Sequence, residues 1–315
     1  MFTVTVIIVN WNSGQWLEKC IKHLLNQSIC ADSILIIDNA SSDGSVEFAS
    51  QISSVELIHA GSNLGFAAAN NLGIARTTSD YIITLNPDAF PDPDWIERLL
   101  AVATRHPDVA SFGSRQMEHS HANVLDGSGD VYHISGVVWR NHHGRKLAQD
   151  DLVQREIFAP CAAAAMYKRQ ALVNVGGFDE DYFCYLEDVD LGFRLRLAGY
   201  KSVYVPDAVV QHVGSATTGG QHSAFSVYHG HRNLVWTYIK NMPSILFWIL
   251  LPLHLILNLV TIVWFSTRGQ TQIILAAKYD AVKGIGRYWG KRKQIQHGRI
   301  ATLSEIWNVL DKRFF

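Results

Sequence analysis

The 315-residue sequence predicts an α/β protein with a doubly wound, mostly parallel sheet, followed by a C-terminal helical region. Short β-branched runs alternate with segments of helical composition over residues 4–85, which is typical of a parallel sheet. From residue 241 onward the chain is first apolar and then basic, which indicates a separate helical region. With 48% hydrophobic and 17% charged residues, the chain has the composition of a folded globular protein.

Four short apolar runs have the composition of strands that are buried on both faces. They lie at residues 4–9, 33–38, 55–59 and 81–85, and helices are expected between them at 16–26, 46–50 and 67–76. A helix at 95–105 is expected to begin after Asp94 as its N-cap. Farther along, we expect a hairpin around Val131–Trp139 and a strand at 203–206.

Polar side chains follow three of the expected strands. Asn10, Asp38 and the run Asn86-Pro-Asp88 each come directly after an apolar run. Because parallel sheets bind ligands outside the carboxyl ends of their strands, these side chains predict a binding site at one edge. The chain has no GxGxxG after the first strand and no GxxxxGK[ST], so a bound nucleotide is expected to be held mainly by side chains.

A second group of acids lies in the first turn of a helix expected at residues 187–198, which Gly199 ends. These acids are Glu187, Asp188 and Asp190. One interpretation is structural: acids are favoured at a helix start, and Asp190 pairs with Arg194 on the surface. The alternative is that one carboxylate is a general base at the mouth of a cleft.

Several short motifs occur in an order and spacing that closely resemble family 2 glycosyltransferases, especially the rhamnosyltransferase-like branch. The resemblance covers about residues 3–235. The motifs are Asn-Trp-Asn at 10–12, Ile-Asp-Asn-Ala-Ser-Ser-Asp-Gly-Ser at 37–45, Asn-Leu-Gly-Phe-Ala at 63–67, Leu-Asn-Pro-Asp at 85–88, Gly-Gly-Phe-Asp-Glu at 176–180 and Glu-Asp-Val-Asp-Leu at 187–191.

The resemblance implies a GT-A fold and a sugar transfer from a nucleotide-diphosphate sugar, with inversion at the anomeric carbon and a divalent metal, Mg²⁺ or Mn²⁺. The donor implied is dTDP-rhamnose or a UDP-sugar. The catalytic domain is expected at residues 1–240, with a nucleotide-sugar half at about 1–112 and an acceptor half at about 113–240. Residues 241–315 form the helical apolar and basic region.

The resemblance also implies roles for single residues. Asp38 is expected to contact the pyrimidine or ribose, the backbone around Val9–Asn12 to line the nucleotide pocket, and Asp88 to bind metal and diphosphate. Asp188 takes the place of the catalytic base. The chain departs from a full Asp-x-Asp motif because the first acid is replaced by Asn86. The expected donor-binding residues are Val9, Asn10, Asn12, Asp38, Asn63, Gly65, Phe66, Asn86, Asp88 and Arg232.

Alternatives stay open at several of these positions. Gly65 either shapes the donor pocket or is a turn glycine, and Arg232 either reaches the diphosphate or acceptor or pairs on a helix surface. His212 is either a second metal ligand, as a late histidine is in some GT-A enzymes, or a structural histidine. Glu187 and Asp190 are expected to be structural supports.

Residues 245–265 contain no charged side chain, which is long enough for a membrane span. Eight basic residues against one acid follow between Arg268 and Arg299. Because the catalytic body and this basic segment both favour the cytoplasmic side, a re-entrant or interfacial helix pair is expected rather than one crossing. The alternative is a buried helix or a dimer interface.

The expected partners are therefore the donor, a glycan or lipid-linked acceptor and an anionic membrane surface; no nucleic acid is expected, and a homodimer is possible. The four cysteines lack metal-ligand spacing, which suits a reducing compartment. We expect a cytoplasmic protein, peripheral on the inner face of the cell membrane and acting in cell-surface polysaccharide synthesis.

Two other functions compete with this interpretation. A sugar nucleotidyltransferase shares the α/β nucleotide domain, but its Gly-rich basic loop after the first strand is absent at Asn10–Gly14. A non-catalytic nucleotide-sugar-binding protein is the second, and the presence of both Asp88 and Asp188 argues against it.

Overall fold

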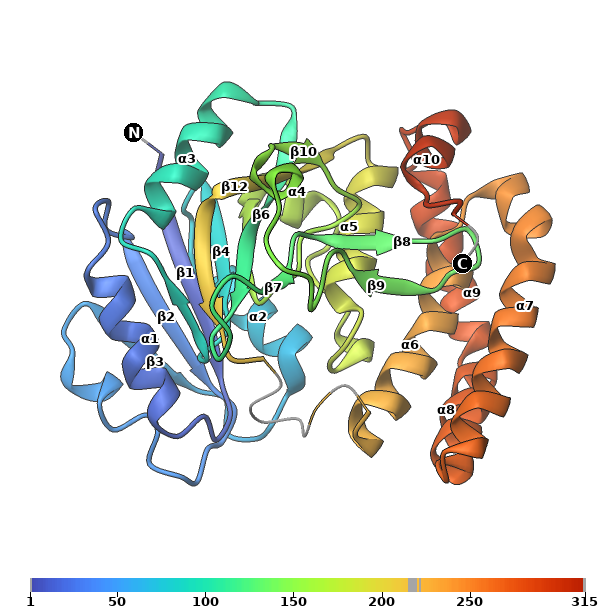
Figure 1. Cartoon of the computed structure of the whole chain (residues 1–315), viewed down its shortest axis with the longest axis horizontal. Coiled ribbons are helices and arrows are strands. Elements are labelled where there is room, and N and C mark those ends of the chain that lie inside the picture. The colour runs from blue at the N-terminus through green and yellow to red at the C-terminus, as the bar shows by residue number, and fades with distance from the viewer. Residues whose placement is uncertain (1, 215–219, 221, 314–315) are drawn as a thin grey trace.

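A computed structural model describes residues 2–214, 220 and 222–313. Figure 1 shows an α/β body at one end of the molecule and a group of helices, α6 to α10, at the other. The body is built on a ten-stranded sheet whose strands follow the order β10-β12-β6-β11-β4-β1-β2-β3, with β5 beside β12 and β7 beside β6. A separate two-stranded sheet pairs β8 with β9.

The strands have the following bounds: β1 Val4–Asn10, β2 Ser33–Asp38, β3 Val55–His59, β4 Tyr81–Leu85, β5 Ala89–Pro91, β6 Val109–Glu118, β7 Leu125–Gly127, β8 Asp130–Tyr132, β9 Val138–Arg140, β10 Arg155–Glu156, β11 Ala164–Lys168 and β12 Lys201–His212. The helices are α1 Gln15–Leu25, α2 Gly65–Arg76, α3 Trp95–Arg105, α4 Arg169–Asn174, α5 Glu187–Leu197, α6 Ala224–Asn241, α7 Ser244–Thr267, α8 Thr271–Lys283, α9 Ile285–His297 and α10 Leu303–Val309, with short 3₁₀ turns η1 Ala49–Gln51, η2 Gln149–Leu152 and η3 Glu180–Tyr182.

The first four strands pair in parallel, as predicted, and both faces of this part of the sheet are covered. One face packs against α1 and α3, and the other against α2, α4 and α5. Because successive residues of a strand point to opposite faces, burial on both faces requires the unbroken apolar runs that marked these strands. The acceptor half adds antiparallel pairs, since β11 runs antiparallel between β4 and β6.

Most of the other expected elements are confirmed, and one is wrong. The hairpin is the pair β8–β9, and residues 203–206 are the middle of the longer β12. Residues 46–50 form turns that lead into η1 rather than a helix, because five residues close too few helical hydrogen bonds to hold one. Asp94 is the N-cap residue of α3, as predicted, but its side chain makes no capping hydrogen bond; the carboxylate accepts a hydrogen bond from Arg98 Nε at 2.8 Å.

Helix α5 lies between the sheet and the C-terminal helices. Its inner side packs with β11 and α4, and its outer side with the hairpin β8–β9 and helices α6, α7 and α9. The predicted pair of Asp190 and Arg194 exists, but it is buried rather than on the surface, because α6 and α9 cover that side of α5. Lys240 of α6, 1% exposed, adds a contact of 2.7 Å to Asp190.

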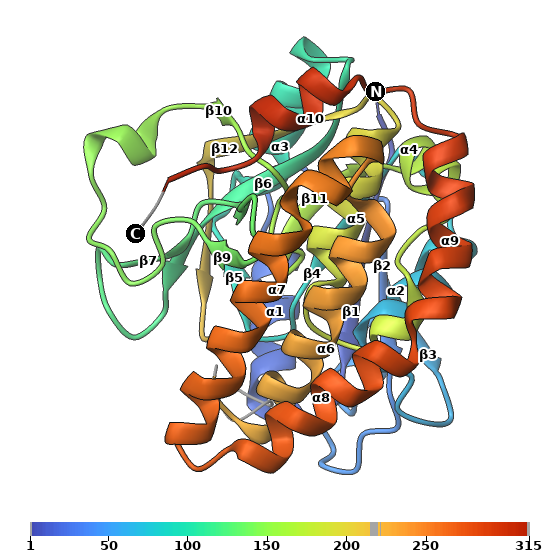
Figure 2. The same cartoon turned by 90° about the vertical axis from the view of Figure 1, so that its right-hand side faces the viewer.

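Helices α7 and α8 form an outer layer over α6 (Figure 2). The segment predicted as apolar is one continuous helix, α7, and α8 returns alongside it as a pair. By length and composition alone, α7 is the one helix of the described residues that qualifies as a membrane span, and 22% of its most apolar window is buried.

Candidate active site

The carboxyl ends of β1 and β2 bring Asn10 and Asp38 together. These two residues are direct neighbours in the parallel register, and Asn10 Nδ2 lies 3.4 Å from Asp38 Oδ1. Asn10 Nδ2 also donates to Ser41 and Ser45, while His59 Nδ1 lies 3.3 Å from Asp38 Oδ2. Asp38 is therefore held firmly at the sheet edge with 4% of its surface exposed.

The loop after β1 is fastened to the loop after β2. Asn12 adopts a left-handed φ of 48°, its backbone N–H donates to Ser41 Oγ at 3.0 Å, and its side-chain oxygen accepts from Ser42 N at 2.8 Å. Asp43 accepts backbone hydrogen bonds from Gly14 and Ser45, as expected of a turn-forming aspartate. Val9, at the end of β1, is half-buried beside this edge.

The predicted loop 63–67 is joined to the segment that precedes α5. Asn63 Oδ1 accepts from Gly65 N at 2.9 Å, and Phe66 N donates to Phe183 O at 2.7 Å. Gly65 has a φ of 78°, and a Cβ there would lie 2.5 Å from the Phe183 ring. Gly65 is thus a turn glycine that also allows the close approach of Phe183, so both interpretations of it hold in part.

Asp88 meets His212 at the other side of β4. His212 ends β12, and its Nε2 lies 3.3 Å from Asp88 Oδ1 and 3.4 Å from Asn86 Nδ2. Its Nδ1 lies 2.8 Å from Asp126 Oδ2. This carboxylate–histidine arrangement fixes the ring and directs Nε2 toward Asp88, which is how ligating histidines are usually oriented.

The electrostatics of this group favour charge on all three members. Burial opposes protonation of His212, but its hydrogen bonds to Asp126 and Asp88 outweigh burial and raise its pKa to about 9. Burial likewise opposes ionisation of Asp88, and the His212 hydrogen bond and charge nevertheless lower the pKa of that carboxyl. The charge of Arg140 helps to lower the pKa of Asp126 far below its ordinary value.

Asp188 lies in the first turn of α5, half-buried. Its Oδ2 accepts from Ala162 N at 3.1 Å and its Oδ1 from Val189 N at 2.8 Å. Burial raises the pKa of Asp188, and the two backbone N–H groups oppose this rise. A carboxyl group with these properties retains basicity near neutral pH, which suits a general base.

The structure adds three residues that the sequence did not single out: Asp126, Asp130 and Arg140. Arg140 donates to Asp126 Oδ2 and to Cys161 Sγ, and Asp130, Cys161 and Asp188 each offer a ligand atom within 4.8 Å of the others. The sequence contains one indication of this contact, Gly127, because only a residue without a Cβ leaves room there for the Arg140 side chain.

These contacts form a continuous chain from the metal-binding candidate to the candidate base. It runs from Asp88 through His212, Asp126 and Arg140 to Cys161, beside which Asp188 lies. The chain crosses strands β12, β7 and β9. The structure therefore brings Asp88, His212 and Asp188 into one polar cluster, although Asp88 precedes the other two by 100 residues or more.

Arg232 of α6 contacts the segment that precedes α5. Its Nη2 donates to the carbonyl oxygens of Asp181 and Tyr182 at 3.3 and 3.1 Å, and its guanidinium lies 4.3 Å from the Trp236 ring. Arg232 thus holds the segment that leads into α5. Glu187 is 6% exposed, and burial followed by the charge of Asp188 raises its pKa well above the ordinary value.

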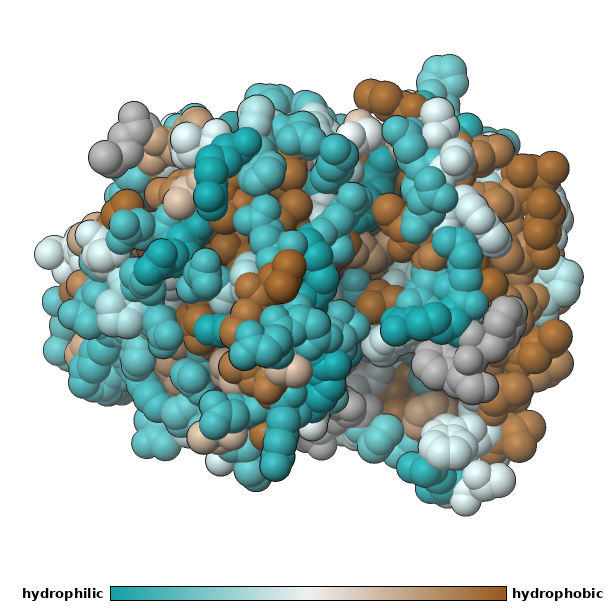
Figure 3. Space-filling model, turned by 45° about the horizontal axis from the view of Figure 1, so that its top comes forward, coloured by the Kyte–Doolittle hydropathy of each residue, from teal (hydrophilic) through white to brown (hydrophobic). Residues whose placement is uncertain are grey.

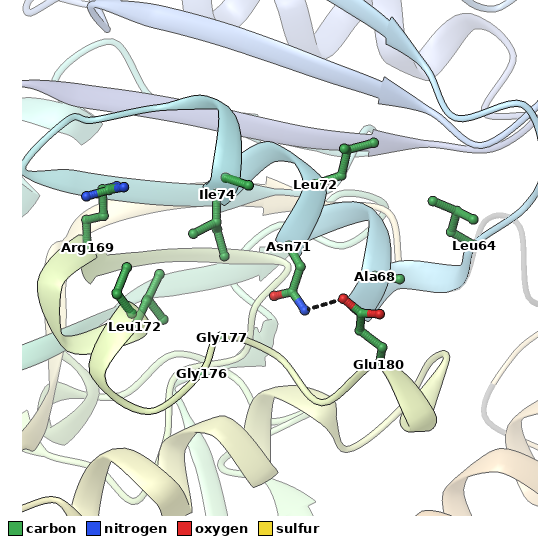
Figure 4. A pocket seen from close by; sticks show the side chains of 12 residues that line it. Leu64, Ala68, Asn71, Leu72, Ile74, Arg169, Leu172, Gly176, Gly177 and Glu180 are labelled. Atoms are coloured by element: carbon green, nitrogen blue, oxygen red, sulfur yellow. Dashed lines mark hydrogen bonds between the residues drawn. The ribbon is translucent and has the colours of Figure 1, made fainter.

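A hollow of the surface lies away from these residues. It has a volume of about 650 Å³ and is bounded by α2 on one side and by α4 and the turn at Gly176–Gly177 on the other (Figure 4). Asn71 and Glu180 face each other across it with a hydrogen bond of 3.0 Å. None of Asp38, Asp88 and Asp188 lines this hollow, so it is not the candidate active site.

A model of glycosyl transferase family 2 matches residues 5–176, which include the sheet edge with Asp38 and Asp88. The chain belongs to glycosyl transferase family 2. It is 33% identical to the N-acetylglucosaminyl-diphospho-decaprenol L-rhamnosyltransferase of Mycobacterium tuberculosis, with 68% of this chain and 77% of the relative covered. It is also 28% identical to the O-antigen chain rhamnosyltransferase RfbN of Salmonella typhimurium, with 66% of each covered.

The fold agrees with this membership. The mannosyltransferase PcManGT from Pyrobaculum calidifontis, solved with GDP-Man and Mn²⁺, superposes with a TM-score of 0.55 at 16% identity, with 98% of this chain and 88% of that chain covered. The predicted GT-A fold and rhamnosyltransferase-like family are confirmed, and the chain is a glycosyltransferase. Membership in the family decides against the alternative of a sugar nucleotidyltransferase.

We expect Gly65→Ala to destabilise this glycosyltransferase more than Gly61→Ala does. Both glycines have a positive φ, at 78° and 76°, so both substitutions strain the backbone by about 1–3 kcal/mol. Only the Cβ at position 65 would overlap Phe183, because nothing lies within 4 Å of a Cβ at position 61. Urea unfolding of both variants measures the difference, and equal midpoints would contradict a role for the Gly65–Phe183 contact.

Proposed function

We propose that this glycosyltransferase moves a sugar from a nucleotide-diphosphate sugar, dTDP-rhamnose or a UDP-sugar, to a hydroxyl of a glycan or lipid-linked acceptor in cell-surface polysaccharide synthesis, with inversion at the anomeric carbon. The observation that carries the proposal is the contact chain between Asp88 and Asp188, which puts a carboxylate for the donor and a single base in one cluster. The two rhamnosyltransferase relatives support the donor and acceptor classes.

The donor side is assigned to the edge formed by β1, β2 and β4. Asp38, Asn10 and the loop at Asn12 are the polar groups at this edge, and they suit the ribose and pyrimidine hydrogen-bonding groups of a nucleoside. The loop 63–67 borders the same edge through the hydrogen bond from Asn39 Nδ2 to Gly65 O at 3.2 Å. Asp88 and Asn86 follow β4 toward the diphosphate position.

The residues at Asp88 fit a divalent cation. Asp88 Oδ1 and His212 Nε2 converge, and Mn²⁺ accepts both carboxylate oxygen and neutral imidazole nitrogen, so the cation would take the place of the proton that His212 Nε2 otherwise shares with Asp88. The cation would stabilise the charge that develops on the leaving diphosphate. Asp130, Cys161 and Asp188 form a second group of possible ligands in this region. Arg140 donates to Cys161 of that group, and its positive charge disfavours a second cation there. We therefore assign Mn²⁺ or Mg²⁺ to Asp88 and His212.

The acceptor side is assigned to Asp188. Its carboxylate takes the proton of the acceptor hydroxyl while that oxygen forms a bond to the anomeric carbon. The bond between this carbon and the phosphate oxygen breaks, and the electron pair leaves with the nucleoside diphosphate. One base is sufficient, because attack from the face opposite the leaving group inverts the centre without a covalent intermediate.

We expect Asp188→Asn to lower transfer by about 10²–10⁴-fold, because the amide cannot accept the acceptor proton. Binding of the nucleoside diphosphate, measured by titration calorimetry, should stay unchanged. Glu187→Gln is the matched control, since it makes the same change from carboxyl to amide at the neighbouring position, to which no proton transfer is assigned. Near-normal transfer by Asp188→Asn, or an equal loss in both variants, would remove the assignment of the base.

A second prediction concerns the metal. We expect Asp88→Asn and His212→Ala to reduce the gain in nucleoside diphosphate affinity that Mn²⁺ provides, by about tenfold or more each. Asp38→Asn, by contrast, should weaken nucleotide binding equally with and without Mn²⁺, since Asp38 is assigned to the nucleoside. Calorimetric titration with dTDP and UDP, with Mn²⁺ or with EDTA, separates these effects. Affinity and transfer that are indifferent to EDTA would refute the metal assignment.

For the C-terminal region we propose that the outer face of α7 and α8 docks on an anionic membrane surface, on the cytoplasmic side. We call this surface the apolar face and define it by its exposed large hydrophobic residues. Hydrophobic residues gather at the right of Figure 3, on the same side of the molecule. The residues that define the apolar face are Ile245, Trp248, Ile249, Leu255, Ile256, Leu259, Val260, Val263, Trp264, Leu275, Tyr279 and Val282.

The packing of α7 favours docking in the membrane plane over a crossing. Leu246 near its start is buried in the cluster that includes α5, and Phe265 near its end is buried against α6 and α8, so α7 packs against the protein near both of its ends. Its polar residues face inward: His254 is 3% exposed and lies 2.8 Å from Ser135 O, and Asn258 accepts from Lys278. A helix with one apolar face free and one packed is typical of interfacial binding.

Charge and aromatic residues at the rim support a lipid partner. Trp248 and Trp264, 62% and 50% exposed, lie near the two ends of α7, as interfacial tryptophans do. Arg268 lies 3.8 Å from the Trp264 ring, Lys283 is exposed at the end of α8, and Arg287 and Lys293 are exposed on α9. Basic residues near an anionic surface contribute about 1 kcal/mol each.

We expect the double variant Leu259→Glu/Val263→Glu to lose binding to vesicles that contain anionic lipid, by about tenfold or more, because it removes two buried apolar contacts with lipid. The matched control is Val153→Glu/Val173→Glu, which changes two exposed valines of the α/β body. Vesicle flotation measures both. Equal binding of the two variants would contradict the membrane proposal, and a dimer that dissociates only in the first variant would assign the apolar face to a second copy.

A further inference from the structure

Asp130 is a carboxyl group beside the proposed base to which the preceding sections assign no role. It begins β8 and is 7% exposed, and it offers an oxygen within 4.8 Å of ligand atoms of both Asp188 and Cys161. Two carboxyl groups this close do not both ionise readily, because like charges repel strongly in a site shielded from water. One of them is therefore expected to keep a proton while the other is charged.

The surroundings of the two groups are unequal. Asp188 accepts backbone hydrogen bonds from Ala162 N and Val189 N, whereas no hydrogen bond to the Asp130 carboxyl is found among the described residues. Hydrogen bonds to a carboxylate favour its ionised form, and burial without such bonds favours the protonated form. Burial, followed by the charge of Asp188, raises the pKa of Asp130 well above its ordinary value. Asp130 is thus the member that keeps the proton.

Arg140 supplies a positive charge to the same pair. It donates to Cys161 Sγ at 2.9 Å and to Asp126, and it lowers the pKa of both Asp188 and Asp130. The other titratable groups that face the pair come from β7, the segment before β11, β11 itself and α5. They are Asp126, which is paired with Arg140 and His212, the Cys161 thiol, and Tyr167 and Glu187, whose pKa values burial raises.

We propose that Asp130 and Arg140 are positioning residues for the base: Asp130 holds the single proton of the carboxyl pair, and Arg140 keeps Asp188 ionised to receive the acceptor proton. This inference rests on the proposed function of Asp188. Asp130 keeps its proton throughout the transfer, and the proton of the acceptor hydroxyl goes to Asp188 alone. No group is oxidised or reduced.

The test is the pH dependence of kcat/KM for Mn²⁺-dependent release of dTDP from dTDP-rhamnose, with water in place of the acceptor. We expect Arg140→Gln to move the acid limb to higher pH by about 1–3 units, since loss of a neighbouring cation raises the pKa of a carboxyl. Arg140→Lys should restore most of the profile. Arg145→Gln is the control, because Arg145 lies in the same segment but pairs with Asp150 and Asp151.

Asp130→Asn should leave the acid limb within about half a pH unit of the wild type, because a neutral amide replaces a neutral acid. A downward shift of one unit or more would show that Asp130 is ionised and would overturn the proposal. So would an Arg140→Gln variant that lowers kcat/KM equally at every pH, since that outcome indicates a structural role only.

A second measurement does not depend on turnover. ¹³C NMR of aspartate carboxyl carbons in the wild-type chain should show one carboxyl that stays protonated above the pH at which Asp188 ionises, with its signal absent in Asp130→Asn. Two carboxyls that ionise together would refute the inference. If the wild type releases neither dTDP from dTDP-rhamnose nor UDP from UDP-sugars while this NMR signal is present, the proposed function fails, but Asp130 still holds the proton of the carboxyl pair.

Discussion

The position of the proposed base depends on a buried ion pair, Lys240 with Asp190. Lys240 comes from α6 and is 1% exposed, and it contacts both Asp190 in α5 and Asp179 in the segment before α5. Asp190 also pairs with Arg194, so removing Lys240 would weaken the compensation of this buried carboxylate without abolishing it. Because the pair joins α5 to the C-terminal helices, those helices do more than cover the sheet: they fix the helix that carries Asp188.

The donor edge was predictable because its determinants are local. Unbroken apolar runs mark strands buried on both faces, and the polar residue after each run must then lie at the same edge of a parallel sheet. Asn10 and Asp38 are neighbours for this reason. The burial of Asp190 was not predictable in this way, because the helices that cover α5 follow it by about 30 residues or more, and helical periodicity says nothing about a second layer.

The acceptor side was harder to predict because its contacts are distant in the sequence. Asp126 and His212 are separated by 86 positions, and residues 114–151 have no sustained periodicity that would have placed Asp126, Asp130 or Arg140 in a common site. They meet because β7 extends the central sheet beside β6, while the small β8–β9 hairpin places Arg140 over Gly127. The one informative feature of the sequence was Gly127 next to Asp126. It indicates a close contact only when its partner Arg140 of β9 is known, and the sequence pattern does not identify that strand.

The carboxyl groups of the site divide by charge. On the donor side, the pKa values of Asp88 and Asp126 are lowered, so a cation meets ionised carboxylates there, and His212 between them would bind it after giving up its proton. On the acceptor side, burial raises the pKa values of Asp130, Glu187 and Asp188 alike, but the carboxylate of Asp188 accepts two backbone hydrogen bonds, which favour its ionised form. Arg140 stands between the two sides and already balances the acceptor-side charge. A divalent cation is therefore drawn to Asp88 rather than to Asp188, although Asp188 has two ligand-bearing neighbours within 4.8 Å.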